Sequence, residues 1–288
     1  MPLVATADLL HTAAAHRTGI GAFNVIHLET AEALTAAAED AGLPVILQIS
    51  QNCVAYHGSL EPIARATLAL AAGSRANVAV HLDHAEDEKL TLQAIDLGFG
   101  SVMFDGAKLD YERNVEATLR VVDYAHANDV LVEAELGEIG GKDGAHAPGV
   151  RTDPEEARRF VDETGVDSLA VAVGSSHAMT ERTAALDLEL IARLKAAVSV
   201  PLVLHGSSGV SDETIVSAIR SGITKVNVST HLNAFFTTAV RRYLAEHPEV
   251  VDSRKYAREG RTAVTAEAAR LLTLFAVSDP ARSERATR

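Results

Sequence analysis

Three histidines follow short apolar runs typical of buried strands: His84 in HLDH, His177 in GSSH and His205 in LHGSS. The sole cysteine, Cys53, lies far from all three in the sequence. Three neutral imidazoles with one open position form a catalytic zinc site, whereas structural zinc sites are closed by four ligands rich in cysteine. One histidine at a strand end is more often a hydrogen-bonded structural residue. Three histidines that converge are more often metal ligands than structural residues. The pattern therefore predicts a metal site, with zinc favoured over Co, Mn or Fe.

Polar residues also end the other apolar runs of the chain. The acidic residues Asp105, Glu133 and Glu135 lie on intervening runs, where they could accept the second ring N–H of a histidine ligand or bind the metal themselves. The full set is Asn24, Gln48, Ser50, Asp83, His84, Asp105, Glu133, Glu135, His177, His205, Asn227 and Ser229. Each residue alone could cap a helix or face solvent. Because all the runs end this way, the sequence predicts one shared polar pocket.

Two segments rich in small polar residues follow the last two apolar runs. One is 205–209, HGSSG, and the other is 227–230, NVST. A glycine and serine loop alone is a weak signal, because ordinary turns use the same residues. In an α/β barrel, however, the loops after the last two strands lie at helix N-termini and bind phosphate. Their position beside His205 therefore predicts a phosphate-binding site.

Eight short apolar or β-branched runs must position these residues. They span 20–24, 44–49, 77–82, 101–104, 130–135, 167–173, 201–204 and 223–228. In the segments between them, apolar residues recur at helical spacing, as in 29–41, 86–97, 111–127, 154–164 and 211–220. Eight strand–helix units predict a parallel sheet closed into a (β/α)8 TIM barrel. A doubly wound open sheet is the alternative, but no GxGxxG motif opens the first unit.

The segments outside the repeats predict further helices. An amphipathic N-terminal helix is expected to end at Gly19, before a barrel that covers about 20–246 and closes with a helix over 231–246. A C-terminal helical extension over 247–278 is expected to contain two helices, 252–260 and 262–276, before a frayed tail, 279–288. We expect one TIM-barrel domain over 1–288, a usual size for this fold.

The composition excludes several classes of protein. With 39 acidic residues against 26 Lys and Arg, the chain lacks the basic excess of a nucleic-acid-binding protein, although a local site could still bind a small anion. No apolar run approaches 18 residues, so no membrane span is expected. One cysteine, Cys53, excludes an internal disulfide, and the N-terminus has no signal-peptide pattern. A cytoplasmic location is therefore expected.

The segments HLDHAED, EAELGEIGG, DSLAVAVGSSH, PLVLHGSSGV and TKVNVST resemble the class II, zinc-dependent fructose/tagatose-bisphosphate aldolase family. The resemblance runs from about Gly21 to Arg258. It implies reversible aldol cleavage of a ketose 1,6-bisphosphate into dihydroxyacetone phosphate and an aldehyde such as glyceraldehyde 3-phosphate. It also implies a homodimer or homotetramer.

The resemblance assigns roles to individual residues. The zinc ligands fall on His84, His177 and His205, the catalytic acid/base falls on Asp83, and alternative metal positions fall on Asp105 and Glu135. The substrate-binding positions are Asn24, Ser50, Ala178, Gly206, Ser207, Ser208, Asn227, Val228, Ser229, Thr230 and Arg258. Main-chain carbonyls around Ala178, Gly206 and Ser208 would also hold Na⁺ or K⁺. Arg258 would reach the far phosphate in a neighbouring subunit.

Two positions depart from the pattern of that family. Asp143, in the loop GGKD, aligns with a mobile proton-transfer carboxylate but is one methylene shorter than the usual residue. Ala178 replaces a usual glycine and tolerates fewer backbone conformations. Both changes leave the metal site intact and bear on the choice of substrate. In the expected mechanism, zinc polarises the ketone, Asp83 acts on the aldehyde half and Asp143 handles the C3 proton.

Three other functions remain compatible with the sequence. The first is a Schiff-base aldolase that uses Lys225, whose parity with Asn227 points it into the barrel, although it lies below the reactive rim. The second is a class II aldolase for another phosphoketose, such as 5-dehydro-2-deoxygluconate 6-phosphate. The third is a non-catalytic phosphosugar-binding barrel, which would need neither Asp83 nor three histidines.

Overall fold

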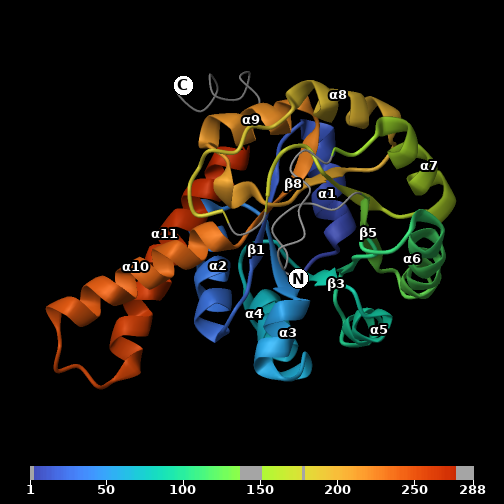
Figure 1. Ribbon diagram of the computed structural model, residues 1–288. Coiled ribbons are helices and arrows are strands. Elements are labelled where there is room, and N and C mark those ends of the chain that lie inside the picture. Colours follow the sequence, from blue (N-terminus) through green and yellow to red (C-terminus); the bar gives the residue numbers. More distant parts are fainter. Residues whose placement is uncertain (1–2, 137–150, 177–178, 277–288) are drawn as a thin grey trace.

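Eight parallel strands close into a barrel in the computed structural model, which describes residues 3–136, 151–176 and 179–276 (Figure 1). The strands are β1 (Ile20–Asn24), β2 (Val45–Ser50), β3 (Val78–Ala85), β4 (Ser101–Phe104), β5 (Leu131–Leu136), β6 (Ser168–Val171), β7 (Leu202–Leu204) and β8 (Ile223–Val228). Each strand pairs with the next, and β8 closes the barrel against β1, with Ile20 opposite Lys225. The predicted TIM barrel is confirmed, and β3 extends beyond its predicted end to Ala85.

Helices surround the barrel and connect its strands. They are α1 (Thr6–His16), α2 (Leu28–Ala41), α3 (Gln51–His57), α4 (Glu61–Gly73), α5 (Glu88–Asp96), α6 (Tyr111–His126), α7 (Pro154–Thr164), α8 (Leu188–Ala197), α9 (Asp212–Ser221), α10 (Thr230–Glu246) and α11 (Ser253–Ala276). Capping side chains fix where several helices begin. Each accepts a backbone N–H from the first turn of the helix that follows; these caps are Asp87, Asp110, Asp153 and Ser211. Helix α5 therefore begins at Glu88, after its cap.

Two predicted helix boundaries were wrong. Helix α1 ends at His16 rather than Gly19, because Arg17 adopts a left-handed conformation (φ 51°) that caps the helix. The two helices predicted over 252–260 and 262–276 form one helix, α11. Gly260 does not break it, since its missing side chain serves packing: a Cβ there would lie 2.6 Å from the Phe236 ring of α10. The predicted frayed tail, 279–288, lies outside the described residues.

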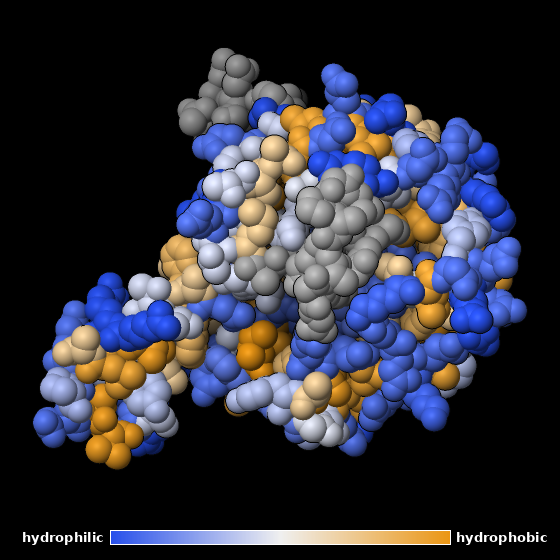
Figure 2. Space-filling model, in the orientation of Figure 1, coloured by the Kyte–Doolittle hydropathy of each residue, from blue (hydrophilic) through white to orange (hydrophobic). Residues whose placement is uncertain are grey.

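The two ends of the barrel differ in character. At the amino-terminal end, Leu9, Leu10 and Ala13 of α1 pack on Ile20 and Ile46 inside the barrel. The opposite end carries the polar strand ends. On one side, α10 and α11 project from the barrel as a helical arm (Figure 1), and apolar residues are exposed on the arm as well as elsewhere on this face (Figure 2). Among the described residues, no helix is long and apolar enough to cross a membrane.

Candidate active site

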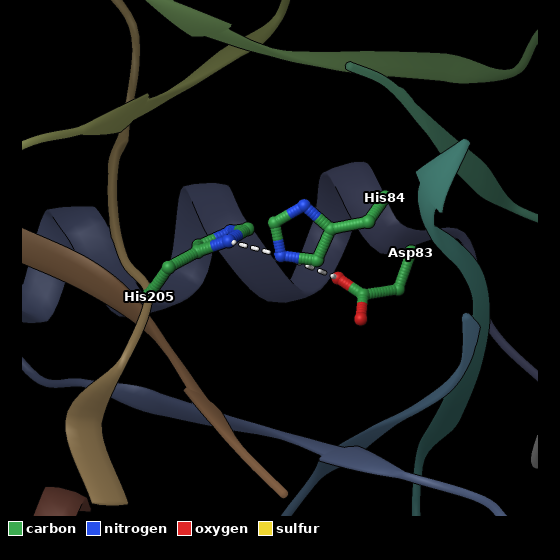
Figure 3. Close-up of side chains that lie close together, drawn as sticks. All are labelled: Asp83, His84 and His205. Atoms are coloured by element: carbon green, nitrogen blue, oxygen red, sulfur yellow. Dashed lines mark hydrogen bonds and ion pairs between the residues drawn. The ribbon is translucent and has the colours of Figure 1, made fainter. Parts of the chain in front are cut away.

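His84 and His205 meet at the carboxyl end of the barrel although 121 positions separate them (Figure 3). Nδ1 of His205 lies 2.8 Å from Nε2 of His84, and the two rings are nearly perpendicular at 87°. Asp83 lies beside them, with Oδ1 4.0 Å from His84 Nε2. These three side chains could hold a metal ion, as could His84, Asp105 and Glu135.

An irregularity in β3 brings Asp83 and His84 to the same pocket. Neighbouring residues of a regular strand point to opposite faces of the sheet. Here the register between β3 and β4 shifts between Leu82 and Ala85, and His84 adopts a left-handed φ of 49°. That conformation costs about 1–2 kcal/mol in a residue other than glycine. Strain of this kind at a strand end is typical of a functional site, because it redirects a side chain toward the pocket.

A carboxylate stands behind each of the two imidazoles. Asp105 Oδ2 lies 2.9 Å from His84 Nδ1, and Glu133 Oε1 lies 3.0 Å from His205 Nε2. Both carboxylates are buried acceptors, so they favour the tautomers whose outer ring N–H points to them and whose inner nitrogens carry lone pairs. Two lone pairs 2.8 Å apart repel unless a proton or a cation lies between them. The donor set therefore fits a metal ion that prefers nitrogen ligands, such as zinc.

Burial favours the neutral, metal-binding form of His205. The side chain is fully buried, and this desolvation, together with the charge of His84, lowers its pKa to about 4. Asp83 shows the opposite balance: burial alone would raise its pKa, but the charges of His84, His205 and Lys225 outweigh burial and lower it. Asp83 is consequently a buried carboxylate that stays ionised at neutral pH.

Two side-chain amides hold the Asp83 carboxylate in place. Asn24 Nδ2 donates to Oδ2 at 3.0 Å, and Asn227 Nδ2 donates to Oδ1 at 3.2 Å. Gln48 orients Asn24 by donating to its Oδ1 at 2.8 Å. The sequence places Gln48 at a strand end but assigns it no role, because a sequence pattern does not show which amide contacts which. In the structure, Gln48 supports the Asp83 carboxylate through Asn24.

The two segments predicted to bind phosphate lie together at the mouth. The Ser207 hydroxyl donates to the main-chain carbonyl of Asn227, and Ser208 Oγ accepts the backbone N–H of His231 at 3.1 Å. Val228 ends β8, Ser229 is the N-cap of α10, and Thr230 begins that helix. Backbone N–H groups at a helix start attract anions.

Several other predicted residues lie elsewhere or carry a second role. Ser50 caps α3 by accepting the N–H of Cys53 at 3.2 Å. Arg258 is exposed on the projecting arm, where it lines a depression with Glu29, Glu32 and neighbouring arm residues rather than the mouth of its own barrel. His177, Ala178 and Asp143 lie outside the described residues.

Lys225 is buried inside the barrel below the histidines. Its Nζ lies 2.7 Å from Glu133 Oε2 and 3.3 Å from His81 Nε2. The sequence indicated the inward direction of Lys225 but not its ion pair with Glu133, which joins residues 92 positions apart.

Comparison with known proteins agrees with this geometry. A family model described as fructose-bisphosphate aldolase class-II matches residues 4–279. The chain belongs to the class II fructose-bisphosphate aldolase family. It is thus a ketose-bisphosphate aldolase, a carbon–carbon lyase of a zinc-dependent class, and the resemblance inferred from its motifs is confirmed.

Individual relatives match this aldolase over nearly their whole length. A fructose-bisphosphate aldolase of Geobacillus stearothermophilus is 39% identical over 270 residues, which cover 92% of this chain and 94% of the relative. The crystal structure of the YdjI aldolase from Escherichia coli K12 superposes with a TM-score of 0.84 at 33% identity, covering 97% and 99% of the two chains. A putative fructose-1,6-biphosphate aldolase from Coccidioides immitis gives a TM-score of 0.84 at 30% identity, covering 96% and 98%.

Gly206→Ala tests whether the loop after β7 forms part of the site. Gly206 has a φ of 64°, and a Cβ there would lie 2.7 Å from the carbonyl of Ser176. The loop must shift, so we expect KM for a phosphorylated substrate to rise at least about tenfold in steady-state kinetics. Gly42→Ala is the control, because Gly42 has a φ of 62° but open space around it. An unchanged KM in Gly206→Ala would place this loop outside the substrate site.

Proposed function

We propose that this aldolase reversibly cleaves fructose or tagatose 1,6-bisphosphate into dihydroxyacetone phosphate and glyceraldehyde 3-phosphate, with one zinc ion per chain. The proposed zinc ligands are His84, His177 and His205. The observation that carries the proposal is the 2.8 Å approach of His84 Nε2 to His205 Nδ1, with a carboxylate behind each ring. The family resemblance supplies His177 as the third ligand.

The reaction needs a polarised carbonyl and a base beside it. Zinc, when bound, supplies Lewis-acid polarisation of the substrate ketone, a contribution of several kcal/mol at the transition state. Asp83 removes the C4 hydroxyl proton in cleavage and returns a proton to the aldehyde oxygen in condensation. Its hydrogen bonds to Asn24 and Asn227 fix the carboxylate, so no reorientation is needed before proton transfer. We assign the C3 proton to Asp143 on the basis of the family resemblance.

The phosphate of the dihydroxyacetone half is proposed to bind between the segments 206–208 and 227–230. Support comes from the hydrogen bond that joins these segments and from the start of α10. A Na⁺ or K⁺ ion beside this phosphate would contact main-chain carbonyls of Ala178, Gly206 and Ser208. For the second phosphate we propose Arg258 of a neighbouring copy in a homodimer or homotetramer, because Arg258 lies on the projecting arm rather than at its own barrel mouth.

The contacts of Lys225 disfavour a Schiff-base mechanism. A nucleophilic lysine needs an uncharged amine that can reach the substrate. Lys225 is fully buried below the histidines, and its Nζ donates to Glu133 Oε2 at 2.7 Å. This contact and the depth of Lys225 support the metal-dependent mechanism.

Metal removal tests the proposed function directly. We expect about one zinc per chain by elemental analysis, and dihydroxyacetone phosphate release from either bisphosphate, followed in a coupled assay, should stop on chelation and return with zinc. His205→Ala should reproduce the loss. Full activity of metal-free protein would contradict the zinc mechanism. Release from 5-dehydro-2-deoxygluconate 6-phosphate in place of both bisphosphates would contradict the substrate assignment.

Asp83→Ala tests the assignment of the acid/base. Cleavage should slow by at least about 10²-fold while zinc content and phosphate affinity stay unchanged, because only proton transfer is removed. The control is Asp87→Ala, which removes a helix cap four residues away and should lower stability by about 1 kcal/mol without slowing cleavage. Turnover of Asp83→Ala near the wild-type rate would assign the acid to another group.

Arg258→Ala tests the contribution of the neighbouring copy. The change should raise KM for a bisphosphate more than KM for a substrate that lacks the second phosphate, because a charge-assisted contact to that group is lost. Arg254→Ala is a matched control on the same arm, since Arg254 is exposed and pairs with Asp252 at 2.9 Å. Equal effects of Arg258→Ala on both substrates would place Arg258 outside the site.

A further inference from the structure

A column of hydrogen-bonded polar side chains runs through the inside of the barrel from α1 to the active site. In order, its members are Thr6, Ser101, His81, Lys225, Glu133 and His205. All six are buried, with at most 3% of each exposed. The column lies beneath the residues proposed for catalysis and ends on one of the proposed zinc ligands.

The lower half of the column directs Lys225 toward the active site. His81 Nδ1 lies 2.8 Å from Ser101 Oγ, which lies 2.9 Å from Thr6 Oγ1. A neutral His81 whose Nδ1–H donates to Ser101 leaves Nε2 as an acceptor for the Lys225 ammonium, 3.3 Å away. Lys225 Nζ is thereby held between His81, on the side of α1, and Glu133, on the side of the active site, to which it donates.

Charge gives a reason for an ammonium group at this depth. Asp83, Asp105, Glu133 and Glu135 are all buried at the mouth, and Lys225 is the one lysine or arginine among the buried residues that the structure describes. A buried ion pair contributes little net stability compared with apolar residues of similar size. Stability alone therefore does not account for Lys225.

The orientation of the His205 ring depends on where Glu133 is held. Glu133 Oε1 lies 3.0 Å from His205 Nε2, where it can accept the ring N–H, and His205 Nδ1 then faces His84 Nε2 at 2.8 Å. Asn227 Nδ2, however, also lies 3.1 Å from His205 Nε2 and could donate to it, which would put the ring proton on Nδ1. That tautomer cannot bind a metal through Nδ1. A carboxylate accepts a hydrogen bond roughly twice as strong as one to a neutral group, so Glu133, held by Lys225 at 2.7 Å, prevails over the Asn227 amide as the partner of His205 Nε2.

We propose that Lys225 is a positioning residue of the metal centre. By fixing Glu133 through Oε2, it holds Oε1 of that residue 3.0 Å from His205 Nε2 and so orients the His205 ring with Nδ1 toward His84. The inference rests on the proposed zinc site and adds a residue that contacts neither the substrate nor the metal. Lys225 acts only through Glu133 and His205.

The test replaces the charge of Lys225 and measures metal binding rather than activity. Lys225→Met keeps the length of the side chain without its charge. Zinc affinity, measured by competition with a chromophoric chelator, should fall by about 10–100-fold, as expected when the partner of a metal ligand is lost. The visible absorption spectrum of the Co²⁺-substituted protein should also change. Lys225→Arg, which keeps a charge next to Glu133, should recover most of the affinity.

Two further variants separate positioning from folding. Leu34→Ala truncates a buried side chain of α2 outside the barrel, so it should lower stability while leaving zinc affinity and the cobalt spectrum unchanged. If Lys225→Met does not fold, the double variant Lys225→Met/Glu133→Gln leaves no uncompensated buried carboxylate at position 133, and it should lose as much affinity as Glu133→Gln alone, because Lys225 acts only through Glu133.

Specific results would overturn the inference. The inference fails if Lys225→Met keeps the zinc affinity and the cobalt spectrum of the wild type. The same holds for the double variant where the single variant does not fold. Lys225 would then only fill space in the barrel. An equal loss of affinity in Leu34→Ala would also overturn the inference. Failure of the proposed function looks different: the wild-type protein itself would bind no zinc, or would release dihydroxyacetone phosphate without it. Absence of zinc binding by the wild-type protein would overturn both proposals together.

Discussion

The 2.8 Å approach of two imidazole nitrogens, from His84 and His205, is the contact on which the site depends. It requires a closed barrel, because the two residues come from β3 and from the end of β7, which are not neighbours in the sheet. It also requires the strained backbone at His84, which turns that ring into the pocket beside Asp83. Both rings are held from behind by carboxylates, so the barrel and its polar interior together set the direction of the lone pairs.

Burial of so many carboxylates at one barrel mouth would be unfavourable without cations nearby. Lys225 supplies one positive charge from below, and a metal ion would supply charge at the histidines. Asn24 and Asn227 provide neutral donors for Asp83. The interior thus combines charged and neutral donors in a region where each unpaired polar group would be costly.

The projecting arm is joined at its base to the loop after β7, which is proposed to bind phosphate. His231, in the first turn of α10, donates its backbone N–H to Ser208, and its ring lies 2.6 Å from Glu267 of α11. Glu267 also pairs with Arg270, at 2.7 Å. The same two helices therefore contact this loop at one end of the arm and carry Arg258 near the other. This arrangement is compatible with the proposed contact of Arg258 with a second copy of the chain.

The sequence by itself determined the eight strands, their order and the polar residues at their ends, because apolar periodicity and strand–helix alternation report local geometry. It also predicted that His84, Asp83 and His205 lie at one mouth of the barrel, since the parallel strands of a barrel end together. Only the tertiary structure decided the bulge at His84, the pairing of Lys225 with Glu133 and the continuity of α11 through Gly260. These features depend on contacts between residues far apart in the chain, and local patterns carry no record of which distant groups meet.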